Sequence, residues 1–345
     1  RSPQDLPDQQ VLAAIADHPT HTEDLGQVTV VNQGDPLAFS DFPEIADTGL
    51  EHRLRLIQQP NMGGCGGFSR GLWETLQDPS LTHVILLDDD IELHADSLAR
   101  AVALFGFAED DVAVGGHMLD LFHPTHLYEA GAMLDPGTLL PRPILHDLDL
   151  ADPEEFSELL HRADPDYNGW WFFGLEADTV RRVGLPLPCF IRGDDIEFGI
   201  RLRQADVHTI TVPGIGVWHE PFYAKLGGWQ QFFENRNLLA MASLREVGQW
   251  RGLRRHLLRS FFGNIARSRY HSASFTVMAM EDYLSGADAC VQTTDEALQR
   301  CLGVTADIGP TVVDREDALL PPVDRRAASN AASSSGGVLR AVAAV

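Results

Sequence analysis

Three consecutive carboxylates, Asp88, Asp89 and Asp90, follow the apolar residues 84–87 with no Gly or Pro between them. An apolar run of this kind is typical of a strand inside a parallel sheet. The ligand crevice of an open α/β sheet lies at the carboxyl ends of its strands, where these acids fall. Like charges so close repel one another, so the cluster favours a bound divalent cation with oxygen ligands. A solvated turn after a strand is the alternative.

Side chains alternate along an extended segment, so Asp88 and Asp90 are expected to face one side and Asp89 the other. A second acidic pair, Asp194 and Asp195, stands at the start of a predicted helix. Acids in a first helical turn are favoured by the helix dipole, so capping is one explanation for Asp194. Two adjacent carboxylates with Glu197 exceed what a cap requires, and a carboxylate near a like charge is a candidate general base.

Further candidates come from the aromatic and glycine-rich segments. His219 directly follows the strand-like residues 209–217, and in a chain that offers a cation site we weigh a ligand role above a core role. Trp170 and Trp171 are adjacent, so in a strand they would face opposite sides, and we expect one of them to line a cleft. The glycine run within residues 61–67 resembles no phosphate-binding fingerprint, and a flexible turn is its alternative explanation.

The elements that position these residues alternate between strands and helices. That alternation predicts an α/β fold with a mostly parallel sheet flanked by helices, followed by a C-terminal helical region. Residues 120–165 show little periodicity and are expected to form a functional loop. The expected strands are residues 28–31, 54–57, 84–87, 112–116 and 209–217; the expected helices are residues 11–16, 68–76 and 97–107, the segment from 194 through 201, and the segments within 229–302.

Composition narrows the function. The chain has 345 residues and a net charge of -24, which argues against binding to the phosphate backbone of nucleic acid. Its four cysteines are far apart, which is consistent with a reducing compartment, and we expect a cytoplasmic location. No apolar stretch is long enough to span a bilayer.

A basic segment stands out in this acidic chain. Residues 251–269 carry arginines interspersed with large apolar residues, a pattern that predicts a helix lying on an anionic membrane surface, here the inner face of the plasma membrane. The alternative is a bundle helix whose arginines pair with the protein's own acids.

Taken in order, several motifs resemble those of inverting nucleotide-sugar glycosyltransferases of the GT-A fold, a Rossmann-like α/β fold. The closest resemblance is to the polymerising UDP-galactofuranosyltransferases of the actinobacterial cell-wall galactan, which are family 2 glycosyltransferases. It covers roughly residues 1–285. The motifs are Asn61 to Arg70, Asp88 to Asp90, Tyr167 to Trp171, Asp194-Asp195 and Trp218-His219.

The resemblance implies a role for each motif. A divalent cation, Mn or Mg, would be held by Asp88, Asp90 and His219 and would bridge the donor diphosphate. Asp195 would be the catalytic base, with Asp194 beside it at the acceptor. Residues that bind the UDP-sugar donor would be Asn61, Gly63, Gly64, Arg70, Asp89 and Arg192, and residues that bind the acceptor would be Trp170, Trp171 and Asp194.

The resemblance also divides the chain. It implies a GT-A domain over residues 1–228 whose first strand would precede Arg1, a helical region over residues 229–310, and a disordered tail over residues 311–345. Two positions depart from the family. Ala132 stands where the family has an acidic acceptor-site residue, and Gly193 stands where close relatives have a bulky Trp, so acceptor choice is expected to differ.

We therefore expect a metal-dependent inverting glycosyltransferase that moves galactofuranose from UDP-galactofuranose to a hydroxyl of a growing cell-wall or lipid-linked glycan. A rhamnosyl or other hexosyl transferase of the same fold is the nearest alternative. A metal-dependent phosphohydrolase and a non-catalytic carbohydrate-binding relative are the others. The resemblance is compatible with a homo-oligomer.

Overall fold

The computed structural model describes residues 7–16, 25–45, 48–109, 111–161, 164–222, 228–286, 288 and 294–309. Residues 1–309 belong to one compact unit. The tail expected over residues 311–345 lies outside the described residues.

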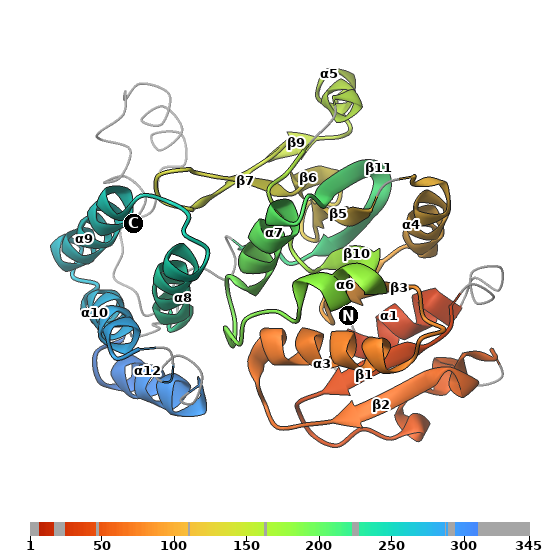
Figure 1. Ribbon diagram of the computed structural model, residues 1–345, viewed down its shortest axis with the longest axis horizontal. Helices are drawn as coiled ribbons and strands as arrows, with labels where there is room; N and C mark the ends of the chain where they lie inside the picture. The colour runs from red at the N-terminus through yellow and green to blue at the C-terminus, as the bar shows by residue number, and fades with distance from the viewer. Residues whose placement is uncertain are drawn as a thin grey trace, which may run out of the picture. The chain divides into compact units, whose positions relative to one another are not determined.

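A mixed sheet of seven strands forms the centre, and its main path runs β3–β10–β5–β11–β4, with β6 and β9 continuing from β5 (Figure 1). In this sheet β5 and β11 are parallel and the other pairs are antiparallel, so the pairing is more mixed than the mostly parallel sheet that we expected. The strands are β3 (His83–Leu87), β4 (Ile91–Leu93), β5 (Val112–Asp120), β6 (His126–Glu129), β9 (Leu148–Asp149), β10 (Phe172–Glu176) and β11 (His208–His219).

Two short strand pairs lie outside this sheet. The parallel pair is β1 (Val28–Asn32) with β2 (Leu54–Gln58), and the antiparallel pair is β7 (Ala132–Leu134) with β8 (Pro141–Pro143). Short 3₁₀ helices connect several elements: η1 (Phe39–Asp41), η2 (Pro43–Ile45), η3 (Leu50–His52) and η4 (Glu158–Leu160).

Helices cover both faces of the sheet. Successive residues of a strand point to opposite faces, so the apolar central strands have side chains to bury on each face. Phe172 belongs to a core cluster with Leu12 and Leu98, and the next residue, Phe173, belongs to a second cluster with Leu72. The first cluster is closed by α1 (Pro7–Ala16) and α4 (Ala95–Phe107); the second by α3 (Gly63–Gln77), α6 (Ala177–Val183) and α7 (Asp194–Gln204). This burial on both faces explains the continuous apolar runs in the sequence.

The C-terminal region is helical, as expected. It contains α8 (Gln230–Leu244), α9 (Trp250–Ala266), α10 (Tyr270–Leu284) and α12 (Thr294–Ile308), and α10 packs against the other three (Figure 1). The predicted α/β class with a C-terminal helical region is confirmed. Among the described helices, none combines the length and apolarity needed to cross a bilayer.

The glycine run does not form the flexible turn that was the alternative explanation. It forms the first turns of α3, which begins at Gly63, five residues before the expected start. Gly63 has φ 71° and lies so close to the 187–190 loop that a Cβ here would be 2.1 Å from the Phe190 carbonyl oxygen. The Cys65 amide donates to the same oxygen at 3.1 Å. Glycine therefore lets the start of α3 approach the loop that leads to Asp194.

Residues 120–165 are also more ordered than the loop that we expected. They contain β6, β7, β8, β9 and the short helix α5 (Pro153–Ser157). These elements have two to five residues each. Such lengths are too short for apolar periodicity to be visible in the sequence.

Candidate active site

Asp88, Asp90 and His219 converge at one edge of the sheet. One potential ligand atom from each lies within 4.8 Å of the other two. His219 Nε2 is 3.0 Å from Asp90 Oδ1 and 3.8 Å from Asp88 Oδ2. The structure therefore brings together the three residues that were predicted to bind metal.

Strand register explains this convergence. Asp88 directly follows β3, and Asp90 directly precedes β4. Antiparallel pairing places His219, the last residue of β11, opposite Ile91 at the start of β4. His219 therefore lies beside the residue that follows Asp90.

Asp89 differs from its two neighbours. It is exposed, whereas Asp88 and Asp90 are half-buried, as alternation along an extended segment predicts. Loss of hydration and the charges of Asp90 and Asp89 raise the pKa of Asp88 to about 6. The expected repulsion within the cluster is therefore present, and a cation would relieve it.

The donor set fits a divalent cation. Two carboxylates and an imidazole are ligands that Mn²⁺ accepts, and Mg²⁺ takes the carboxylates readily. The other imidazole nitrogen, His219 Nδ1, is buried and has no hydrogen-bond partner among the described residues. That nitrogen leaves the choice of tautomer free, so Nε2 can offer its lone pair to a metal.

Asp194 and Asp195 begin α7, as predicted. The preceding residue, Gly193, has φ 91°, a left-handed conformation that L residues adopt rarely. Gly193 has no side chain to cap the helix, and the Ile196 amide of the first turn donates to Asp195 Oδ1 at 2.8 Å. Asp194 is buried and Asp195 is half-buried.

Glu197 belongs to the scaffold of this helix. Its side chain is fully buried and forms a two-bond ion pair with Arg201, with N···O distances of 2.7 and 2.8 Å. Arg245 of the α8 C-cap also donates to it, at 2.6 Å from Nε. These bonds fix α7 against the helical region and leave Asp194 and Asp195 as the acids of the cluster that no arginine pairs with among the described residues.

The environment makes Asp194 and Asp195 weaker acids than an ordinary aspartate. Burial raises the pKa of Asp195 to about 6, although the positive charge of Arg192 opposes the shift. Burial and then the charge of Asp195 raise the pKa of Asp194 to about 8. Asp88 contributes to the same shift, so the acidic pair and the predicted metal site are within electrostatic range. A carboxylate with a pKa near 6 is a stronger base than an ordinary aspartate and is still ionised at neutral pH.

Arg192 lies in this site. Its guanidinium stacks over the Phe222 ring at 5.0 Å and approaches Glu234 at 3.7 Å. Phe222 also contacts the rings of His219 and Trp171, with centroids 5.9 and 6.2 Å away. The positive charge of Arg192 therefore lowers the pKa of Asp195.

Trp170 and Trp171 lie in the turn before β10 and belong to the two different core clusters, but neither lines an open cleft. Only 4% and 5% of their surfaces are exposed. Trp170 packs edge-on against Phe68, and the Trp171 indole N–H donates to the Gly116 carbonyl at 2.8 Å. The expectation of an exposed Trp was wrong because helices cover both faces of the sheet at this point.

The predicted donor-binding residues on and before α3 are dispersed. The Asn61 side chain accepts a bond from the Gly63 amide at 2.9 Å and supports the helix start. Gly64 is exposed. Arg70 pairs with Glu74 at 2.6 Å, one turn further along α3, and its role as a donor contact stays a prediction.

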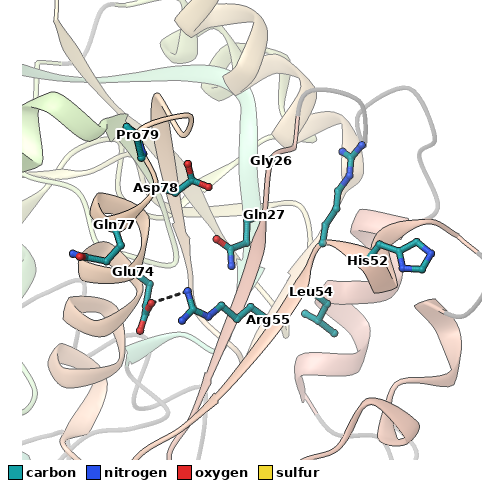
Figure 2. Close-up of a pocket in the computed structure, with 10 residues that line it drawn as sticks. Gly26, Gln27, His52, Leu54, Arg55, Glu74, Gln77, Asp78 and Pro79 are labelled. Atoms are coloured by element: carbon teal, nitrogen blue, oxygen red, sulfur yellow. Dashed lines mark ion pairs between the residues drawn. The ribbon is translucent and has the colours of Figure 1, made fainter.

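A pocket of about 480 Å³ lies at the other end of α3. Figure 2 shows that Glu74, Gln77 and Asp78 line it from the helix. Arg55 forms an ion pair with the buried Glu74 at 2.7 Å (Figure 2). This ion pair neutralises the charges of Arg55 and Glu74. The residues that line the pocket do not include the acids of the candidate active site.

Two buried ionisable residues near Asp195 were missed by the sequence reasoning as site residues. Glu129 ends β6, and Tyr167 precedes β10; both are buried. The charge of Asp195 helps to raise the pKa of each. The only sequence signal for Glu129 was its position three residues before Ala132, where the family has an acid.

Comparisons with known proteins are consistent with this geometry. Residues 9–237 match the family described as glycosyltransferase-like family 2. The chain is 34% identical over 325 residues to the galactofuranosyltransferase GlfT2 of Mycolicibacterium smegmatis, which covers 90% of this chain and 50% of the relative. It is 33% identical over 314 residues to GlfT2 of Mycobacterium tuberculosis, which covers 86% of this chain and 49% of the relative.

The chain therefore spans about half the length of the curated relatives that it matches. The predicted resemblance to galactofuranosyltransferases is confirmed by these identities. A solved structure of GalNAc-T7 with UDP, GalNAc and Mn²⁺ superposes with a TM-score of 0.46 at 14% identity, covering 83% of this chain and 52% of the other. That score is too low to bear on fold or ligands.

Proposed function

The chain belongs to glycosyltransferase-like family 2, and from that membership we propose that it transfers galactofuranose from UDP-galactofuranose to a hydroxyl of a cell-wall or lipid-linked glycan, with inversion. The observation that carries the proposal is the meeting of Asp88, Asp90 and His219 in electrostatic range of the Asp194–Asp195 pair. The first cluster would hold the cation that stabilises the departing diphosphate, and the Asp194–Asp195 pair would accept the proton of the incoming hydroxyl.

The acceptor half of the reaction falls to α7. Asp195 takes the proton of the acceptor hydroxyl while the oxygen of that hydroxyl bonds to the anomeric carbon. The bond from the anomeric carbon to the diphosphate oxygen breaks, and the electron pair leaves with UDP. Asp194, which retains its proton more strongly, hydrogen-bonds the acceptor beside it. Attack from the face opposite to the leaving group inverts the configuration.

The donor half falls to the edge of β3, β4 and β11. Asp88, Asp90 and His219 would hold a divalent cation, Mn²⁺ or Mg²⁺, which acts as a Lewis acid for the diphosphate when bound. Arg192, beside Asp195, is available for the donor phosphates or sugar. Asn61, Gly63 and Gly64 remain proposed donor contacts at the start of α3, where the Gly63 and Cys65 amides already donate to Asn61 and to the Phe190 carbonyl. Asp89 is exposed there and remains a proposed donor contact.

Trp170 and Trp171 act indirectly in this proposal. Both are buried, so they hold β10 and the Phe222 ring in place behind the acceptor space.

A donor screen tests the function. UDP-galactofuranose, UDP-galactopyranose and a rhamnose nucleotide are offered with a galactofuranosyl acceptor, with Mn²⁺ or with EDTA, and the product anomer is assigned by NMR. We expect product only from UDP-galactofuranose, only with metal and with inverted configuration. Product from the rhamnose donor would favour the rhamnosyl transferase. UDP release without acceptor would favour a phosphohydrolase, and failure to bind Mn²⁺ or UDP would favour a non-catalytic relative.

We also infer that α9 binds an anionic membrane surface, where a lipid-linked acceptor resides. Its four arginines Arg251, Arg254, Arg255 and Arg259 form no ion pair or hydrogen bond with any described residue. With Leu258 and Phe262 they line a hollow of about 380 Å³. This observation supports the lipid explanation over internal ion pairs, because four unpaired cations in a chain of charge -24 attract an anionic partner.

Co-sedimentation with vesicles tests this inference. We expect binding to phosphatidylglycerol vesicles that falls with salt, and weak binding to phosphatidylcholine vesicles. The variant with Arg251, Arg254 and Arg255 changed to Gln should lose binding about a hundredfold, since each basic residue contributes about 1 kcal/mol. The control changes Arg100, Arg142 and Arg181, which form surface ion pairs, and removes the same charge. Equal loss in both variants would count against α9.

A further inference from the structure

Glu129 is a buried carboxyl near the start of α7. It is the last residue of β6, opposite Met118 of β5, and only 5% of its surface is exposed. Its side chain forms no hydrogen bond or ion pair with any residue that the structure describes. A ligand could therefore supply the hydrogen-bond partner that this carboxyl lacks among the described residues.

Backbone contacts attach the segment that follows Glu129 to α7. Three residues further on, the Ala132 amide donates to the Tyr167 carbonyl at 3.1 Å, and the Asp166 amide donates to the Ala132 carbonyl at 2.9 Å. Tyr167 lies directly on α7, since a Cβ at Gly199 would be 2.4 Å from the Tyr167 Cβ. The chain after β6 is therefore attached, through Tyr167, to the helix that begins with Asp194 and Asp195.

The electrostatics agree with this placement. Burial and then the negative charge of Asp195 raise the pKa of Glu129 to about 8. Burial and then the charges of Asp195 and Glu129 raise the pKa of Tyr167. At neutral pH Glu129 is therefore mostly protonated, and a neutral carboxyl can donate one hydrogen bond and accept others.

We propose that Glu129 is an acceptor-binding residue, whose carboxyl hydrogen-bonds a second hydroxyl of the acceptor sugar beside the hydroxyl that Asp195 deprotonates. The inference rests on the proposed glycosyl transfer. A sugar presents adjacent hydroxyls, each able to donate and accept, so one can face Asp195 while its neighbour satisfies Glu129. The contact fixes the sugar's orientation and with it the hydroxyl that is extended.

The test compares Glu129→Ala and Glu129→Gln with Glu176→Ala and Glu176→Gln. Glu176 ends β10 opposite His83, at the other end of β3 from Asp88, so it controls for loss of a carboxyl in the same sheet. Methyl β-galactofuranoside serves as the acceptor probe, and its binding is measured by saturation-transfer NMR. UDP binding and acceptor-independent UDP release are measured for every variant.

We expect Glu129→Ala to weaken acceptor binding about tenfold, the loss of one hydrogen bond in a buried site, with UDP binding and UDP release unchanged. Glu129→Gln should remain within about threefold of wild type, because an amide also donates and accepts. Both Glu176 variants should match wild type.

Three outcomes would overturn the inference: unchanged acceptor binding in Glu129→Ala, an equal loss of acceptor and UDP binding, or a Glu129→Gln variant as impaired as Glu129→Ala. If Glu129→Ala does not fold, Glu129→Asp keeps the carboxyl on a side chain shorter by one methylene, and it must then weaken acceptor binding with UDP binding intact. Absence of all transfer by the wild type would instead refute the proposed function, while probe binding would still test Glu129.

Discussion

His219 Nε2 lies 3.0 Å from Asp90 Oδ1, although the two residues are far apart in the chain. The contact is made by strand pairing, because β11 places His219 opposite Ile91, the residue after Asp90. The sheet therefore holds the candidate cation site: His219 ends β11, and Asp90 directly precedes the neighbouring strand β4. Ligands fixed by a sheet keep their spacing when a substrate arrives.

Removal of either carboxylate should disable the donor site. We expect Asp88→Ala and Asp90→Ala each to lower transfer about a hundredfold or more, since each removes a ligand oxygen. Mn²⁺ affinity and UDP affinity, measured by calorimetry with and without metal, should fall together. Asp96→Ala, which removes an exposed acid of α4 paired with Arg100, is the matched control. Full wild-type activity after exhaustive chelation would refute the cation role.

His219→Ala should have a smaller effect. Two carboxylates remain, so we expect a loss of about tenfold in transfer at low metal that is partly restored by higher Mn²⁺. The ring also packs near Trp171, so thermal unfolding must be followed in the same variant. If added Mn²⁺ restores nothing while the protein stays folded, His219 is a packing residue.

Asp195→Asn should separate binding from chemistry. Asn keeps the shape and accepts hydrogen bonds but cannot take a proton, so we expect turnover to fall about 10²–10⁴-fold with UDP affinity nearly unchanged. Asp194→Asn should keep more turnover and raise the acceptor KM. The two variants are compared side by side by steady-state kinetics and calorimetry. Near-normal turnover in Asp195→Asn would make Asp194 the first candidate for the base.

The pH profile should report the base. The pKa of Asp195 in the folded protein is raised to about 6, so the ionised, active form is present above pH 6 and is lost as pH falls through 6. We expect kcat/KM to fall about tenfold per pH unit below this point. Arg192 lowers this pKa, so Arg192→Gln should move the acid limb to higher pH. Arg182→Gln, on α6, should leave it in place.

Glu197→Ala should destabilise the fold. It leaves Arg201 and Arg245 near one another without their shared carboxylate, and breaking such a buried pair costs about 3–5 kcal/mol. Urea unfolding measures the loss, with Glu158→Ala as a surface control expected within about 0.5 kcal/mol. A loss equal to that of the control would show that other contacts hold α7.

The sequence alone determined the features that depend on neighbouring residues. Alternation along an extended segment turns Asp88 and Asp90 to one side and Asp89 to the other, and the structure agrees. The helix start at Asp194 and Asp195 was likewise readable, because first-turn acids and the following apolar positions are local signals. Trp170 and Trp171 do enter different core clusters, although they lie in a turn and not in the strand from which this was predicted.

Tertiary structure decided which of these local features meet. The β11–β4 register brings His219 to Asp90, and Tyr167, which pairs with Ala132 and contacts Gly199, joins the segment after β6 to α7. The burial of both indoles depends on the helices packed against the sheet, and the start of α3 at Gly63 depends on its contact with Phe190. Strand register and packing join residues that are distant in sequence. A local pattern of apolar and polar residues does not specify which distant segments pair.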